Sequence, residues 1–154
     1  MASPAPSLLL PQTTRSDILI ACDDDAVAHK LQTLFRAAGL KSVCTRSIAV
    51  ACYAAKSGQY SVIFSTPSLA DGSWRHVLDA SKNCGTAPAI VPAIVVVARS
   101  FDINEWAETL RYGAFDVLDS IEEMARAPEV ASLAFSAASA TAPQDRSGKA
   151  PVQN

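Results

Sequence analysis

Residues 60–73 read YSVIFSTPSLADGS, and this stretch decides the fold. The apolar run from Val62 to Phe64 has the length of a buried strand, and a loop carrying Pro67 breaks it. The turn signal Asp71-Gly72 then precedes the next helix. No charged side chain stands at the end of the strand. That absence is the main functional clue, because the flanking pattern is typical of a strand that presents a carboxylate there.

The length and composition of the chain limit the classes of protein to which it can belong. The chain has 154 residues, of which 49% are hydrophobic and 18% charged, and this length suits one domain with a single core. A formal net charge of −2 gives no basic surface for nucleic acid. No apolar run reaches membrane-spanning length, and residues 1–12 make a poor secretory signal. We therefore expect a soluble, cytoplasmic protein that binds neither nucleic acid nor membranes.

The two ends of the chain differ in composition from its middle. Residues 1–16 and 138–154 are rich in Pro, Ser, Ala and Thr and lack apolar periodicity, so we expect flexible tails on a domain spanning 17–137. The sequence contains four cysteines, Cys22, Cys44, Cys52 and Cys84. They show no CxxC spacing and the chain has two histidines, which favours neither a zinc site nor a disulfide framework.

Between the tails the apolar pattern alternates between strand and helix periods. The predicted strands are 18–22, 41–44, 61–65, 93–98 and 115–118, and the predicted helices are 27–38, 47–57, 74–83, 103–112 and 121–137. The strand at 93–98 is the least ambiguous because it is apolar throughout. Pro128 falls inside the last helix and is expected to kink or split it, since proline lacks the amide donor.

Five strands alternating with five helices predict an α/β fold. The expected architecture is a doubly wound, five-stranded parallel sheet with helices on both faces. In such sheets, ligands bind beyond the carboxyl ends of the strands, at the switch in strand order. The loops after Cys22, Ser65 and Ala98 are therefore the expected functional loops.

Four motifs then point to a family. They are ILIACDD at 18–24, GQYSVIF at 58–64 followed by DGS at 71–73, the stretch 92–99, and GAFDVL at 113–118. In this order and spacing they resemble the receiver domain of bacterial two-component response regulators over about residues 17–137. The resemblance implies a flavodoxin-like fold with strand order 2-1-3-4-5. It also implies a role in phosphorelay signal transduction for a protein that is not itself an enzyme.

The resemblance also assigns site positions. Family members accept a phosphoryl group from a histidine kinase on an aspartate ending the third strand, and a hydroxyl and a lysine on later strands sense the phosphate. The match places the acceptor position at Thr66, the hydroxyl position at Val97 and the lysine position at Ser120. The aromatic whose rotation reports activation corresponds to Val117. None of these four side chains supplies the group that the family uses.

The acidic pair that holds Mg²⁺ in the family matches the turn after the first strand. An ungapped match places Cys22 and Asp23 on the pair, and a slip of one residue places Asp23 and Asp24 there. We expect at most a vestigial metal site, because Mg²⁺ would lack the acceptor carboxylate and gives up its waters reluctantly. The favoured alternative is an acidic turn that caps the following helix. No cofactor is therefore expected.

The joint loss of acceptor, hydroxyl and lysine predicts a stand-alone pseudo-receiver that acts by protein–protein contact without aspartyl phosphorylation. The expected partners are signalling proteins, either a histidine kinase or an output protein, or a second copy of the chain. The expected surface is the fourth helix, fifth strand and fifth helix, Asn104–Met124. Trp106, Leu110 and Tyr112 are its candidate interface residues. Trp106 and Leu110 share a helix face, and packing of that face on the sheet is favoured over contact with a partner.

A second hypothesis keeps chemistry in the same crevice. Asp23, Asp24 and Thr66 would carry residual Mg²⁺-dependent phosphoryl acceptance or ligand sensing, and Cys22 would be a thiol sensor. A helix N-terminus beside Cys22 lowers a thiol pKa, whereas the aspartates next to it raise that pKa.

Overall fold

The structure is a computed structural model that describes residues 18–82, 91–99 and 102–147. The predicted N-terminal tail, Cys84 and the last residues of the predicted C-terminal tail lie outside this part of the chain. Within the described ranges, no helix has the length and apolar character needed to cross a membrane.

Five parallel strands form the central sheet. They are β1 (Ile18–Ala21), β2 (Ser42–Thr45), β3 (Val62–Ser65), β6 (Ala93–Ala98) and β7 (Asp116–Asp119). Their order is β2-β1-β3-β6-β7, which is the predicted order 2-1-3-4-5 when these five strands are counted along the chain. Ala21 pairs with Ser65, and Ser65 pairs with Val96, so the carboxyl ends of neighbouring strands meet at one edge. The prediction of a flavodoxin-like, doubly wound parallel sheet is confirmed.

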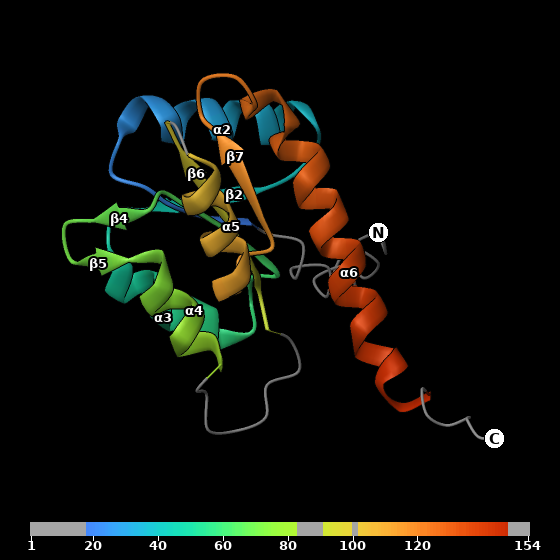
Figure 1. Ribbon diagram of the computed structural model, residues 1–154. Coiled ribbons are helices and arrows are strands. Elements are labelled where there is room, and N and C mark those ends of the chain that lie inside the picture. The colour runs from blue at the N-terminus through green and yellow to red at the C-terminus, as the bar shows by residue number, and fades with distance from the viewer. Residues whose placement is uncertain (1–17, 83–90, 100–101, 148–154) are drawn as a thin grey trace, which may run out of the picture.

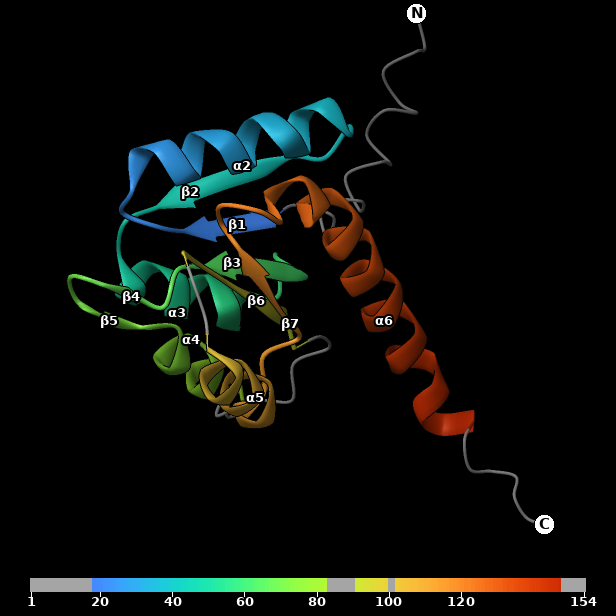
Figure 2. The same cartoon turned by 45° about the horizontal axis from the view of Figure 1, so that its top comes forward.

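Helices cover both faces of this sheet. One face carries α2 (Asp25–Ala37) and α6 (Ala127–Ser147). The other face carries α3 (Ile48–Ser57), α4 (Trp74–Lys82) and α5 (Ile103–Tyr112), as Figures 1 and 2 show. This is the arrangement that right-handed crossovers between parallel strands produce.

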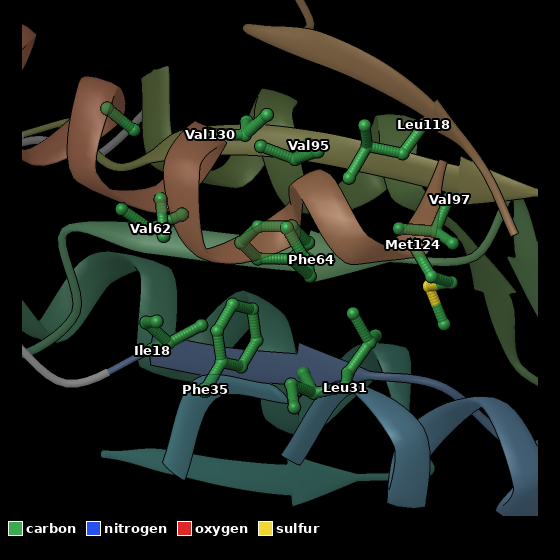
Figure 3. Packing of buried hydrophobic residues seen from close by; sticks show 14 of the residues in the cluster. Ile18, Leu31, Phe35, Val62, Phe64, Val95, Val97, Leu118, Met124 and Val130 are labelled. Atoms are coloured by element: carbon green, nitrogen blue, oxygen red, sulfur yellow. The ribbon is translucent and has the colours of Figure 1, made fainter. Parts of the chain in front are cut away.

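Each face of the sheet has its own core because successive strand residues point to opposite sides. In β1, Ile18 and Ile20 pack towards α2 and α6, whereas Leu19 packs towards α3 and α4. Figure 3 shows the first core, where Phe35 of α2 meets Phe64 of β3 edge to face at 5.0 Å between ring centroids. Both rings are fully buried, and each such burial contributes about 1.5–3 kcal/mol.

The last helix differs from the sequence prediction. A single 3₁₀ turn, η2 (Met124–Arg126), precedes α6, and α6 itself begins at Ala127. Pro128 therefore lies in the first turn of α6, where backbone amides have no intrahelical acceptor and a missing N–H costs nothing. The predicted helix 121–137 is therefore divided next to Pro128, into η2 and α6, whereas a kink at Pro128 inside the helix is not found. The helix also continues to Ser147, so the domain boundary predicted at residue 137 falls within it.

A short antiparallel hairpin that the sequence did not predict follows β3. It consists of β4 (Ser68–Leu69) and β5 (Gly72–Ser73), with Asp71 in the turn between them. The Asp71 carboxylate accepts hydrogen bonds from backbone amides in the first turn of α3. The hairpin is therefore tied to the body of the domain beside the carboxyl edge of the sheet.

Candidate functional site

A crevice of about 340 Å³ lies at the carboxyl edge of the sheet. The end of β6 and the segments that follow β1, β3, β6 and β7 line it with Asp23, Asp24, Val27, Thr66, Pro67, Ser68, Val97, Ala98, Arg99 and Ser120. Five site residues proposed from the sequence, from four different segments, thus lie in one place. Val117 does not line this crevice, and its side chain is 4% exposed. The roles of these residues remain predictions.

Thr66 occupies the end of β3 beside β1. Its backbone amide donates to the carbonyl of Ala21 at 3.1 Å, which extends the β1–β3 pairing by one residue. Its hydroxyl donates a long hydrogen bond of 3.5 Å to the carbonyl of Ser68. Within the described part of the chain, no imidazole or carboxylate is hydrogen-bonded to this hydroxyl. A threonine needs such a base to act as a nucleophile, so the site shows no activation of Thr66.

The positions of the family's hydroxyl and lysine, Val97 and Ser120, are also uncharged. Val97 is 1% exposed, and Figure 3 shows it within the core near Met124 and Leu118. The amide of Ser120 donates to the carbonyl of Ala98 at 2.7 Å, which holds Ser120 at the end of β6. Among the residues that line the crevice, Arg99 is the one cation. Sequence reasoning did not single out Arg99, although its place directly after β6 could have suggested it.

The acidic turn after β1 serves the fold. Asp24 is the N-cap of α2, and its carboxylate accepts from two first-turn amides at 2.9 and 3.2 Å. Asp25 forms an ion pair with Arg46, whose guanidinium also donates to the backbone carbonyl of Asp23. The capping role favoured by the sequence is therefore present. Within the described residues, no group of three or more His, Cys, Asp or Glu side chains is placed to hold a metal ion. The vestigial Mg²⁺ site stays a prediction.

Cys22 is a poor candidate for a reactive thiol. Its side chain is 3% exposed, and its sulfur accepts from the amide of Asp24 at 3.3 Å and donates to the carbonyl of Asp24 at 3.4 Å. Burial raises the pKa of the Cys22 thiol, and the charges of Asp24 and Asp23 raise it further. Because the thiolate is the reactive form, this environment argues against thiol sensing.

The three candidate interface residues have different surroundings. Trp106 is 46% exposed and belongs to neither core, so the favoured packing of this side chain on the sheet is wrong. Leu110 is partly buried. Tyr112 contacts α4 within the same chain, where its ring meets Trp74 at 5.5 Å and its phenol donates to Asp79 at 3.1 Å. Trp106 is therefore the most exposed of the three, whereas Tyr112, at 38% exposed, is held against α4.

A groove of about 300 Å³ lies beside Trp106, between α5 and the segment that follows β7. It is lined by Asp102, Ile103, Trp106, Val117, Asp119, Glu122 and Glu123. The groove falls largely within the surface Asn104–Met124 expected from the sequence. Sequence reasoning identified Trp106 but missed Ile103 and the carboxylates, whose clustering at 119–123 was the available signal.

Comparison with known proteins establishes the fold. No protein family model and no curated protein matches the sequence. Several of the solved structures that it resembles are receiver domains. One is the signal receiver domain of a protein described as a Luxo repressor from Vibrio parahaemolyticus, with TM-score 0.69, 17% identity, and 81% of this chain and 93% of that chain covered.

Two further structures agree. The receiver domain of a Francisella response regulator gives TM-score 0.67 at 16% identity, over 79% of this chain and 98% of that one. The beryllofluoride-activated NtrC4 receiver domain dimer gives TM-score 0.66 at 16% identity, with the same coverage of 79% and 98%. At such identities the likeness shows the fold alone. The chain has the fold of response-regulator receiver domains.

Proposed function

We propose that this chain is a pseudo-receiver, a receiver-fold domain of two-component signal transduction that acts by protein contact without aspartyl phosphorylation. The observation that carries the proposal is the crevice at the carboxyl edge of the sheet. It holds Thr66 where the resemblance expects the acceptor aspartate, with a core valine and a serine at the other two positions.

The chemistry of phosphoryl transfer supports this reading. Transfer depends on a well-placed nucleophile and on cations and donors that stabilise charge on the phosphoryl oxygens. Thr66 has a neutral hydroxyl with no base hydrogen-bonded to it in the described residues. Val97 has no donor, and Ser120 carries no charge. Each of the three positions thus lacks a group that phosphoryl transfer needs, whereas the surrounding residues pack into two hydrophobic cores.

A receiver fold that has lost its phosphoryl acceptor still has the surfaces through which it can bind other proteins. The proposed role is therefore docking to signalling proteins, either a histidine kinase or an output protein, rather than catalysis. Trp106 supports this role because tryptophan is enriched at the energetic centres of interfaces and this side chain is about half exposed.

Treatment with acetyl phosphate and Mg²⁺, followed by intact mass measurement, tests the proposal. We expect no gain of a phosphoryl group, whereas an aspartate-bearing receiver domain treated alongside gains one. An acid-labile gain would reveal an acyl phosphate and overturn the proposal. An acid-stable gain that disappears in Thr66→Ala would overturn it too, because it would make Thr66 itself an acceptor.

A further inference from the structure

The groove beside Trp106 is lined by two exposed apolar side chains, which we call its floor, and by four carboxylates, which we call its rim. Its floor includes Ile103, which is 77% exposed, and Trp106, which is 46% exposed. The rim consists of four carboxylates, those of Asp102, Asp119, Glu122 and Glu123. A volume of about 300 Å³ is at the small end for a ligand pocket and suits one or two long side chains.

The floor residues are exposed to solvent and belong to neither hydrophobic core. Ile103 and Trp106 are three residues apart on α5 and so lie on one helix face. Among the described residues, the Trp106 ring has no aromatic partner and its N–H donates no hydrogen bond. Trp74 is 4% exposed and packs on Tyr112, so the chain's other tryptophan is a core residue.

The rim is held in place by the backbone. The Asp119 carboxylate accepts from the amides of Ile121 and Glu122 at 2.7 and 3.2 Å. Glu123 accepts from the amide of Asp119 at 2.9 Å and from the guanidinium of Arg126 at 3.4 Å. Asp102 caps α5 through the amide of Glu105. The Glu122 carboxylate has no partner within the described part of the chain and is free to meet a cation.

All the residues that line this groove belong to a strongly acidic segment of the chain. Residues 102–129 hold eight carboxylates and two arginines, a net charge of −6, whereas the whole chain carries −2. The remainder of the chain is therefore net positive. Four of these eight carboxylates line the groove, so the groove attracts cations more strongly than the net charge of the whole chain suggests.

We propose that this groove binds a basic segment of a partner protein, with an apolar side chain seated on Ile103 and Trp106 and with arginine or lysine side chains on the acidic rim. The inference rests on the proposed function, because it names the partner class of the docking surface. A guanidinium stacked on the exposed indole would add a cation–π contact.

Charge also decides between a basic partner and a second copy. A symmetric dimer places the same patch of both subunits in contact. Through this face, the two acidic rims would oppose each other, and like charges across an interface are unfavourable. A partner with the opposite charge gains both the electrostatic attraction and the apolar contact.

Peptide binding tests the inference. The probe is a short, dye-labelled peptide in which arginine alternates with leucine, and binding is followed by anisotropy and by tryptophan emission. Because Trp74 is buried, a blue shift on binding reports Trp106. We expect binding that weakens as salt is added, since exposed charges are screened over a Debye length of about 8–10 Å near physiological ionic strength.

Matched variants locate the site. Glu122→Lys should weaken binding about tenfold or more, because it reverses the free carboxylate of the rim. Trp106→Ala should remove most of the binding. Glu108→Lys is the control, since Glu108 is an exposed α5 residue outside the groove, and its effect should be several times smaller. Circular dichroism and thermal melts show that the variants remain folded.

Three results would overturn the inference. They are the absence of peptide binding, equal binding of a matched peptide with glutamate in place of arginine, and a dimer seen by sedimentation that Trp106→Ala dissociates. The acetyl phosphate experiment separates this inference from the proposed function. A chain that takes up phosphate refutes the proposed function whatever the peptide does. If the chain gains no phosphoryl group and does not bind the peptide, only the groove proposal is refuted.

Discussion

The carboxylate of Asp71 lies 2.8 Å from the backbone nitrogen of Ile48, in the first turn of α3, and accepts its hydrogen bond. It also accepts from the amide of Ala49 at 3.1 Å and from the hydroxyl of Ser47 at 3.0 Å. A residue of the β4–β5 hairpin thus caps a helix that begins 23 positions earlier in the chain. Because this hairpin follows Thr66 and Pro67, the cap fixes the loop that borders the crevice.

Removing this cap should destabilise the domain in a pH-dependent way. The amides of Ile48 and Ala49 hold the pKa of Asp71 below its usual range. The charged carboxylate therefore contributes stability above the unfolded-state pKa of about 4, and this contribution is lost as the pH falls through the lower folded-state pKa. We expect Asp71→Ala to lower Tm by several degrees at pH 7.

Thermal melts down to about pH 2 check the sign, because that range spans ordinary and depressed carboxyl pKa values. The gap between wild type and Asp71→Ala should narrow as the pH falls. Asp71→Asn, which keeps an acceptor oxygen without the charge, should lie between them at pH 7. An Asp71→Ala variant as stable as wild type at pH 7 would show that the cap does not hold the hairpin.

Tyr112 should behave as a link between α4 and α5. Its ring lies beside Trp74 and under the guanidinium of Arg75, 4.7 Å from the ring centroid, and its phenol donates to Asp79. The hydrogen bond to Asp79 raises the pKa of Tyr112. Its stabilising effect is therefore complete below the unfolded-state pKa of about 10 and is lost as the pH rises through the higher folded-state value.

We expect Tyr112→Phe to lower Tm modestly at neutral pH and Tyr112→Ala to lower it further, because alanine also removes the ring contacts. The difference between wild type and Tyr112→Phe should shrink in strongly alkaline buffer. Melts across pH 7 to about 11, which spans the ordinary phenol pKa, measure both effects. A Tyr112→Ala variant with unchanged Tm and weakened partner binding would instead support the interface role expected from the sequence.

A side chain at Gly113 should destabilise the domain. It ends α5 with φ 138°, and a Cβ built there would lie 2.7 Å from Cδ2 of Leu78. Gly113→Ala should reduce the free energy of unfolding by about 1–3 kcal/mol, from backbone strain together with the displaced leucine. Gly39→Ala is the control. Gly39 also has positive φ but no atom within 4 Å of a built Cβ, so the loss should be smaller, about 1–2 kcal/mol at most. Urea unfolding that finds equal losses would contradict the predicted clash.

The central sheet could be predicted from the sequence, because apolar runs such as Ala93–Ala98 leave few alternatives to a buried parallel strand. The β4–β5 hairpin was missed since strands of two residues are too short to show a period. The effect of Pro128 depends on where α6 begins. The hydrogen bonds of Asp119 and Glu123 organise the turn before η2, and those bonds are not visible in an apolar pattern.

The sequence predicts which residues meet at the candidate site, but it does not predict which side chains are exposed or paired there. Alignment of parallel strand ends brings Thr66, Val97 and Ser120 together once the strand order is known. An amphipathic pattern on α5 does not say which flank touches the sheet, so the exposure of Trp106 required the structure. The pairing of Asp25 with Arg46 joins two loops, and sequence spacing carries no information about such a contact.

The intact mass of Thr66→Asp after treatment with acetyl phosphate, with and without Mg²⁺, decides whether the acceptor position alone accounts for the inactive site. Because the hydroxyl and lysine positions have also lost their functional groups, restoring the acceptor alone should not restore phosphorylation. We expect no Mg²⁺-dependent gain of a phosphoryl group in this variant. A gain that requires Mg²⁺ and is accompanied by a conformational response, such as a change in Trp106 emission, would contradict the account.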